Sequence, residues 1–172
     1  MTTTWDKQAI ASLLSDAFAP NLAKPMKNKS VDAPTATIDV LITFDKFGVS
    51  SHANHISLYH GARHFIASLI HNRPGWGSPV DLYTLNTVSL VRKYTSFFDS
   101  VCSLLAMAFG PKQTGAHPSP LLLLSGIGEV RIAQKAMTTA HKSQMRWFRW
   151  GWIGLSRYMV VNDLRLEKVT GK

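Results

Sequence analysis

The stretch ATIDVLITFD, residues 36–45, is a nearly continuous run of apolar and β-branched residues that ends in a carboxylate. Runs of this kind are typical of a strand that is buried on both faces of a parallel sheet. The segment GVSSHANH, residues 48–55, follows and places two histidines three positions apart, just before a segment with helical spacing. A strand, a short loop and a helix in this order predict an α/β fold.

The helix is expected from about His52 to Ile70, with Ser50 or Ser51 as its N-cap. Strands that alternate with helices predict βαβ units and a parallel sheet with helices on both faces. The inner face of the helix at 52–70 is expected to consist of Ala62, Phe65, Ile66 and Leu69. Further strands are expected at 80–89, at 121–125 as a buried strand and at 163–169 as an edge strand, with helices at 2–20, 90–109, 129–140 and 143–159.

The composition limits the classes of protein that the chain can belong to. A length of 172 residues fits one domain. Nineteen Lys and Arg against ten Asp and Glu give a formal net charge of +9, which indicates either an acidic partner, such as a phospholipid surface, or only a soluble surface. The single cysteine, Cys102, excludes an internal disulfide and lies among apolar residues, so a buried thiol is predicted. No apolar run reaches the ~18 residues that span a bilayer.

The two histidines of residues 48–55 are candidates for an active site. On a helix, positions i and i+3 share a face, so His52 and His55 are expected to converge beyond the carboxyl end of the strand, where ligands bind in α/β sheets. One imidazole can bind a metal while the other stabilises an oxyanion or protonates a leaving amine. The alternative is a pair of helix-start histidines bonded to solvent or backbone. His60 and His64 have a spacing found at zinc sites, but the Glu of H-E-x-x-H is absent, and solvated histidines are expected there.

The segment ITFDKFGVSSHANH, residues 42–55, resembles the N-acetylglucosaminylphosphatidylinositol de-N-acetylases of the LmbE-like superfamily of zinc-dependent sugar deacetylases. The family pattern T-F-D-x-x-G-V-S-G-H-x-N-H matches from Thr43 to His55, except that Ser51 stands where the family usually has Gly. The likeness continues in the same order through residues 4–14, 85–94 and 133–164. It therefore covers almost the whole chain.

The resemblance implies a partial Rossmann-like sheet and a zinc-dependent enzyme that removes the N-acetyl group from N-acetylglucosaminyl-phosphatidylinositol in GPI-anchor biosynthesis, at the cytosolic face of the endoplasmic reticulum membrane. If the roles known in that family carry over, His55 would be a metal ligand and His52 would stabilise the oxyanion or donate a proton. Asp45 would orient the site. Arg92 and Lys93 are candidates for contact with the phosphoinositol, and a structural ion pair is the equal alternative.

One motif of the family is absent. The P-H-P-D-D-E segment, which supplies the other zinc ligands and the general base, occurs nowhere in the 172 residues. The chain is therefore expected to be a C-terminal portion, a single incomplete deacetylase domain over residues 1–172 whose activity alone is doubtful. Loss of the first strand would leave an unpaired apolar sheet edge. The alternatives are a non-catalytic remnant that binds membranes or partners, and a deacetylase of a soluble amino sugar.

The segment HKSQMRWFRWGWIGLSRYM, residues 141–159, interleaves aromatic side chains with arginines. Such a segment can rest at a membrane interface, with the rings at headgroup depth and Arg146, Arg149 and Arg157 on lipid phosphates. The alternative is that the rings belong to the core and the arginines to a solvated face. Nucleic acid is not the expected partner, because no recognised RNA- or DNA-binding motif is present.

Overall fold

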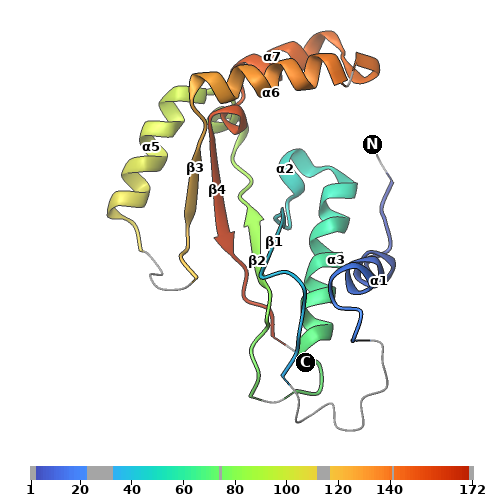
Figure 1. Cartoon of the computed structure of the whole chain (residues 1–172). Coiled ribbons are helices and arrows are strands. Elements are labelled where there is room, and N and C mark those ends of the chain that lie inside the picture. The colour runs from blue at the N-terminus through green and yellow to red at the C-terminus, as the bar shows by residue number, and fades with distance from the viewer. Residues whose placement is uncertain (1–2, 23–32, 74, 112–116, 141, 171–172) are drawn as a thin grey trace. The chain divides into compact units, whose positions relative to one another are not determined.

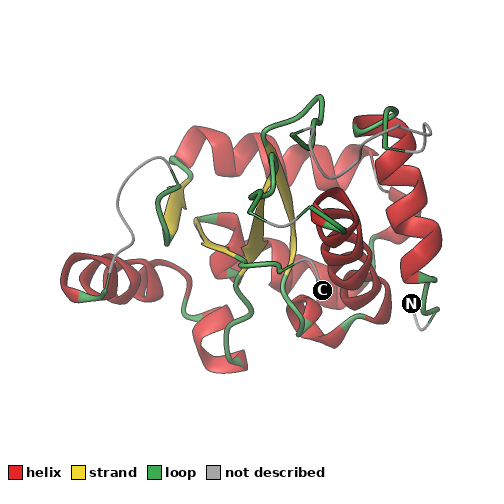
Figure 2. Cartoon of the chain, turned by 90° about the horizontal axis from the view of Figure 1, so that it is seen from below, coloured by secondary structure: helices red, strands yellow, loops and turns green. Residues whose placement is uncertain are grey.

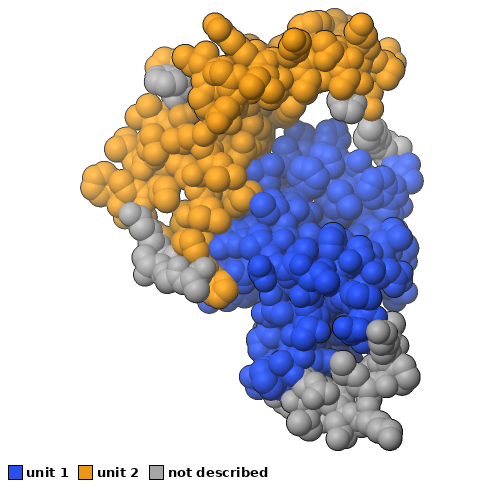
Figure 3. Space-filling view, in the orientation of Figure 1, with its two compact units in different colours: residues 1–87, 165–172 blue, residues 88–164 orange. Residues whose placement is uncertain are grey.

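The computed structural model describes residues 3–22, 33–73, 75–111, 117–140 and 142–170 (Figure 1). The chain divides into two compact units, residues 1–87 with 165–172 and residues 88–164 (Figure 3). The single domain expected from the length stays a prediction. A sheet with the strand order β1-β2-β4-β3 and surrounding helices make this a mixed α/β structure (Figure 2).

The elements of the first unit are α1 (Lys7–Phe18), β1 (Val40–Phe44), the short turn α2 (Gly48–Ser51), α3 (Ala53–Ile70) and β2 (Asp81–Leu85). The elements of the second unit are α4 (Leu90–Tyr94), α5 (Ser96–Phe109), β3 (Leu121–Leu124), α6 (Ile127–Ala140), α7 (Trp147–Leu155) and two 3-10 turns, η1 (Lys142–Gln144) and η2 (Arg157–Met159). Strand β4 (Val161–Leu166) is the last element along the chain. Its first four residues belong to the second unit and its last two to the first unit.

The prediction of an all-parallel sheet is wrong for the two C-terminal strands, β3 and β4. Strands β1 and β2 are parallel, with Val40 opposite Asp81, but β3 and β4 are antiparallel, with Leu121 opposite Leu164. The chain leaves β3 through α6 and comes back through α7, and the N–H of Ser125 donates to the carbonyl of Val160 at 2.8 Å. Strand β4 therefore starts at the end of the sheet where β3 stopped. It lies between β2 and β3, so its predicted edge position is also wrong.

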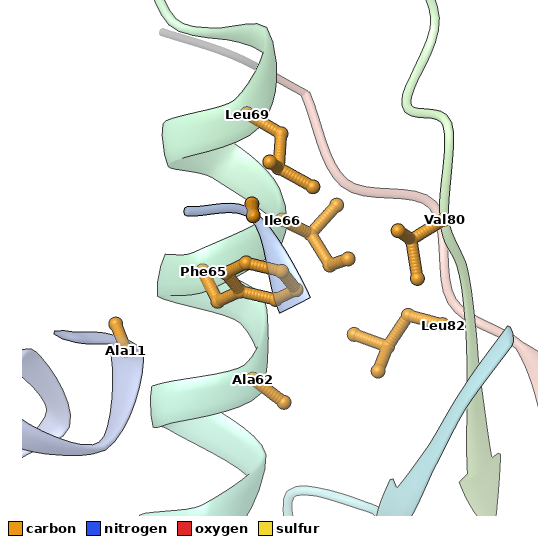
Figure 4. Packing of buried hydrophobic residues seen from close by; sticks show 8 residues of the cluster. Ala11, Ala62, Phe65, Ile66, Leu69, Val80 and Leu82 are labelled. Carbon is orange, nitrogen blue, oxygen red and sulfur yellow. The ribbon is translucent and has the colours of Figure 1, made fainter. Parts of the chain in front are cut away.

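Helix α3 supplies the core of the first unit. The four residues expected on its inner face, Ala62, Phe65, Ile66 and Leu69, are all buried, which confirms that prediction. They pack with Val80 and Leu82 from the β2 side (Figure 4). Complete burial of a side chain of this size contributes roughly 1.5–3 kcal/mol, so this contact holds α3 against the sheet.

Helix α1 packs directly on α3. Its N-cap is Asp6, whose carboxylate accepts a hydrogen bond from the N–H of Ala9 at 2.9 Å. The two helices meet at Gly61, where an added Cβ atom would lie 2.4 Å from the side chain of Ile10. Only a residue without a side chain lets α1 approach this closely.

Strand β1 does not have the two buried faces expected from its apolar run. Leu41 packs against the core, but Val40 and Ile42 are 47% and 58% exposed. Strand β1 is at one end of the strand order, and within the first unit α3 packs against one of its faces. The prediction of a buried strand at 121–125 is wrong for a similar reason, because β3 is at the other end and its last two leucines are about half exposed.

The second unit has ionic groups at its centre. Arg157 of η2 is completely buried, and its Nε lies 2.6 Å from Oδ2 of Asp99 on α5. Its Nη1 donates to Asp163 Oδ1 at 3.0 Å, and its Nη2 donates to Ser103 Oγ at 3.0 Å. The interpretation of Arg157 as a cation on lipid phosphate is therefore wrong, since its charge is neutralised inside the unit.

Candidate functional site

The carboxylate of Asp45 joins the loops that follow β1 and β2. Its Oδ1 accepts hydrogen bonds from the N–H groups of Phe47 and Gly48, each at 3.0 Å. The hydroxyl of Thr87 donates to the same oxygen at 2.6 Å, and the N–H of Thr87 donates to Oδ2 at 2.7 Å. Both loops leave the carboxyl ends of parallel strands, so Asp45 fixes the backbone at the edge where α/β sheets bind ligands.

The loop held by Asp45 has an unusual backbone. The φ angles of Gly48, Val49, Ser50 and Ser51 are +65°, +40°, +71° and +58°. Such values are uncommon outside glycine and are a real outlier for a β-branched residue. At Gly48 an added Cβ would also lie 2.7 Å from Cγ1 of Ile56, so that position needs glycine. A strained turn of this kind persists only where surrounding contacts hold it, and the bonds to Asp45 are among them.

The N-cap of α3 is His52, whose side chain makes no capping hydrogen bond. The expectation that Ser50 or Ser51 caps the helix is wrong. An N-cap residue needs an extended backbone, which His52 has with φ −71° and ψ 123°, whereas both serines are left-handed. The cap lies one residue later than expected.

His55 is held from three sides. Its Nδ1 lies 2.9 Å from the carbonyl oxygen of Gly48, and its ring stacks on Phe44 with centroids 3.8 Å apart. The ring of His52 lies edge-on at 5.1 Å. The structure therefore brings the two histidines together at the end of β1. A carbonyl oxygen only accepts hydrogen bonds, so Nδ1 of His55 carries a proton, and in the neutral imidazole the lone pair is then on Nε2.

This arrangement of His55 suits a metal ligand. Histidines that bind metals usually donate the other ring N–H to a carbonyl or carboxylate, which fixes tautomer and orientation. A catalytic zinc, however, normally has three protein ligands. Among the residues that the structure describes, no group of three or more His, Cys, Asp or Glu side chains is placed to hold a metal ion. These residues therefore do not form a zinc site by themselves.

Arg92 and Lys93, the residues expected to contact the substrate, lie on α4 in the second unit. Nε of Arg92 donates to Oδ1 of Asp99 at 2.6 Å, and this hydrogen bond raises the pKa of the guanidinium. Burial lowers the pKa of Lys93. Arg92 thus makes the structural ion pair that was the alternative, and substrate binding by these two residues stays a prediction.

The rival pair on α3 lies away from this loop. His60 is exposed, and its ring meets that of Tyr59 edge-on at 5.1 Å. It lines a depression of about 550 Å³ together with residues at the start of α1. Neither His52 nor His55 lines that depression.

Thr87 is a residue of the loop network that the sequence reasoning missed. Its hydroxyl donates to Asp45 and accepts from the N–H of Val49 at 3.1 Å. A signal was present, because Thr87 is a polar residue two positions beyond the strand that ends at Leu85. Polar residues at the carboxyl ends of parallel strands are candidates for a site.

Several known proteins are similar to this chain. An N-acetylglucosaminyl-phosphatidylinositol de-N-acetylase from Arthroderma benhamiae is 45% identical over 98% of the chain and 57% of the relative. A probable enzyme of the same name from Schizosaccharomyces pombe is 35% identical over 74% of the chain and 46% of the relative. The enzyme of that name from Bos taurus is 36% identical over 74% of the chain and 44% of the relative.

The similarity to the first of these relatives extends along nearly the whole chain. The chain belongs to the N-acetylglucosaminyl-phosphatidylinositol de-N-acetylase family, and it spans about half the length of the curated relatives it matches. No family model matches the chain. No solved structure matches it either.

Replacing Ser51 with Gly is expected to raise the free energy of unfolding by about 0.5–1 kcal/mol, because glycine adopts a φ of +58° without strain. Urea denaturation measures the change. Ser12→Gly on the exposed side of α1 is the matched control and is expected to destabilise by about 0.5 kcal/mol. Equal destabilisation by both changes would contradict the strain assigned to this turn.

Proposed function

We propose that this chain forms part of an enzyme that hydrolyses the N-acetyl group of N-acetylglucosaminyl-phosphatidylinositol in GPI-anchor biosynthesis. The observation that carries the proposal is the hydrogen bond from Nδ1 of His55 to Gly48, which leaves Nε2 ready to bind a cation. The names of the relatives supply the substrate. In the reaction, water adds to the acetyl carbon, the C–N bond breaks and the amine takes a proton, giving acetate and a free amino sugar.

The proposed roles follow from where the side chains lie. His52, whose ring is 5.1 Å from that of His55, would donate a hydrogen bond to the developing oxyanion or a proton to the amine. Asp45 is a positioning residue, since it acts through the backbone of Gly48. Zinc is the proposed metal and His55 one of its ligands, with the others supplied from elsewhere in the protein.

Contact with a membrane is part of the proposal because the substrate is a glycolipid. None of the helices in the described ranges is both long and apolar enough to cross a bilayer. Helix α7 offers a different contact. Trp147 and Trp150 are 87% and 59% exposed, and Arg146 beside them is exposed too. Exposed Trp and Arg suit the headgroup layer. His141, the first residue of the aromatic and basic segment 141–159, lies outside the described residues. The proposed location is the cytosolic face of the endoplasmic reticulum membrane.

A second candidate is a non-catalytic remnant of the family that binds membranes or partners. The incomplete set of metal ligands among the described residues favours it. The two candidates differ in whether this chain can serve as part of a working enzyme.

A chimera distinguishes the two candidates. We would replace the matching segment of the Arthroderma benhamiae relative with this chain, which aligns over 98% of its own length. In detergent micelles the chimera is expected to release free amine from N-acetylglucosaminyl-phosphatidylinositol at a rate within about tenfold of the parent, and to leave soluble N-acetylglucosamine unchanged. A chimera that folds, as judged by circular dichroism, but shows no turnover would refute the proposal and support the remnant. Turnover of the soluble sugar at the same rate would instead support a soluble substrate.

A further inference from the structure

Helix α5 has its polarity reversed. Asp99, Ser100 and Ser103 are buried, with 4%, 5% and 8% exposure. Phe98 and Phe109 are 77% and 87% exposed. A surface helix in water normally shows the opposite pattern, with apolar residues inward and polar residues outward. The outward face of α5 is therefore poorly suited to water.

Five exposed apolar residues of α5 form one stripe. Phe98, Val101, Cys102, Leu105 and Phe109 are spaced at i, i+3, i+4, i+7 and i+11, which places them on one face. All five are exposed. The prediction that Cys102 is a buried thiol is wrong because this residue belongs to the stripe. The stripe carries no charge, since Asp99 is the sole charged residue of the helix and faces inward.

The buried contacts fix this orientation. Asp99 lies between two arginines, with Oδ1 2.6 Å from Nε of Arg92 and Oδ2 2.6 Å from Nε of Arg157. Ser103, one turn later, donates to Asp99 and accepts from both arginines. A rotation that buried the apolar stripe would expose Asp99 and take its carboxylate away from the buried Arg157, which would keep Asp163 as an ionic partner. That penalty is several kcal/mol, so α5 keeps its apolar face outward.

We propose that this stripe inserts into the interface of an anionic bilayer, with α5 parallel to the membrane surface and its side chains among the upper acyl chains. A helix of 14 residues is about 21 Å long, too short to cross a hydrocarbon core of about 30 Å. Apolar helices of this kind lie in the plane of the interface.

Charge favours an anionic lipid surface over a second copy of the chain. Residues 88–164 contain nine Lys and Arg against three Asp and Glu, and the acids include Asp99 and Asp163, which pair with arginines. The exposed cations of the unit include Arg131, Lys135 and Lys142. Each Lys or Arg near an anionic bilayer contributes about 1 kcal/mol, whereas two copies would repel each other. The inference goes beyond the deacetylase activity and does not depend on it.

The single cysteine of the chain permits a direct test on the full chain. A polarity-sensitive thiol fluorophore on Cys102 is expected to shift its emission to the blue when vesicles of phosphatidylcholine with 30% phosphatidylserine are added. Nitroxides on the lipid acyl chains are expected to quench it. Quenching by a water-soluble quencher alone, while the protein floats with the vesicles, would overturn the proposal.

Flotation of unlabelled variants gives a second measurement. Phe98→Ser with Phe109→Ser is expected to weaken vesicle binding at least tenfold, and Leu13→Ser on the exposed side of α1 is the matched control and should have no effect. Equal losses by both variants would overturn the role of α5. Equal binding of the native chain to pure phosphatidylcholine would overturn the anionic surface. Light scattering that shows a dimer without vesicles, dissociated by the double Phe variant, would assign the stripe to a second copy instead.

Discussion

Replacing Asp99 with Asn is expected to lower the free energy of unfolding by about 3 kcal/mol, because removal of one carboxylate from a buried ionic cluster leaves the buried cation less well compensated. Arg157 would remain completely buried, with Asp163 as an anionic partner and Ser103 as a hydrogen-bond acceptor. Urea denaturation at pH 7 measures the loss. Asp16→Asn on the exposed side of α1 is the matched control and is expected to change stability by less than about 0.5 kcal/mol.

A second substitution tests the cause. If the reduced compensation of the Arg157 charge is responsible, Arg157→Met in the Asp99→Asn background should recover a substantial part of the stability, since a buried pair is often replaced by apolar groups with little loss. Arg92→Ala, which removes the outer and half-exposed partner of Asp99, should destabilise by less. An Arg92→Ala loss as large as that of Asp99→Asn would show that the outer pair, rather than the buried one, stabilises the unit.

The ion pairs of Asp99 with Arg92 and Arg157 should also determine how stability changes in acid. Burial alone would raise the pKa of Asp99, but hydrogen bonds from Arg92 and Ser103 and the charges of both arginines together lower it. A lowered folded-state pKa gives stability that is fully present above the unfolded-state value of about 4 and is lost as the pH falls through the folded value. The free energy of unfolding should therefore decrease more steeply below about pH 4 in the native chain than in Asp99→Asn.

Replacing His55 with Ala in the chimera is expected to reduce kcat/KM by about a hundredfold or more. The change removes the imidazole that the hydrogen bond to Gly48 orients for metal binding through Nε2. Loss of a residue that only hydrogen-bonds to a metal ligand already lowers metal affinity or activity about 10–100-fold. The zinc content of the purified chimera, measured by atomic absorption, should fall with the activity.

The control for His55 is on the same helix. His60→Ala removes an exposed imidazole away from the loop, and it should leave kcat/KM and zinc content within about twofold of the chimera. Retained zinc in folded His55→Ala would exclude this residue as a ligand. Equal losses from both substitutions would point to a general effect on α3.

Part of the fold could be predicted from the sequence because it depends on local periodicity. The inner face of α3 follows from the spacing of Ala62, Phe65, Ile66 and Leu69, and the structure buries all four. The positions of β1 and β2 follow from apolar runs bounded by loops. The meeting of His52 and His55 follows from their spacing and from the loop that precedes them.

Other features depend on contacts between distant residues. The antiparallel direction of β4 is set by the return of α7 to the end of β3. The outward face of α5 is set by Asp99, whose partner Arg157 lies 58 positions later and cannot be paired with it by periodicity. The left-handed turn also has no periodic signal, although the departure of Ser51 from the glycine of the family marks one of its positions.

The hydrogen bonds of Asp45 limit what this carboxylate can do. Its two oxygens receive the N–H groups of Phe47, Gly48 and Thr87 and the hydroxyl of Thr87, close to the four acceptor sites that an ionised carboxylate has. Three of these hydrogen bonds end on Oδ1, which makes that oxygen a poor acceptor for the proton of an attacking water. Asp45 therefore serves as a fixed anchor for the loop, and we expect the proposed hydrolysis to use another residue as its general base.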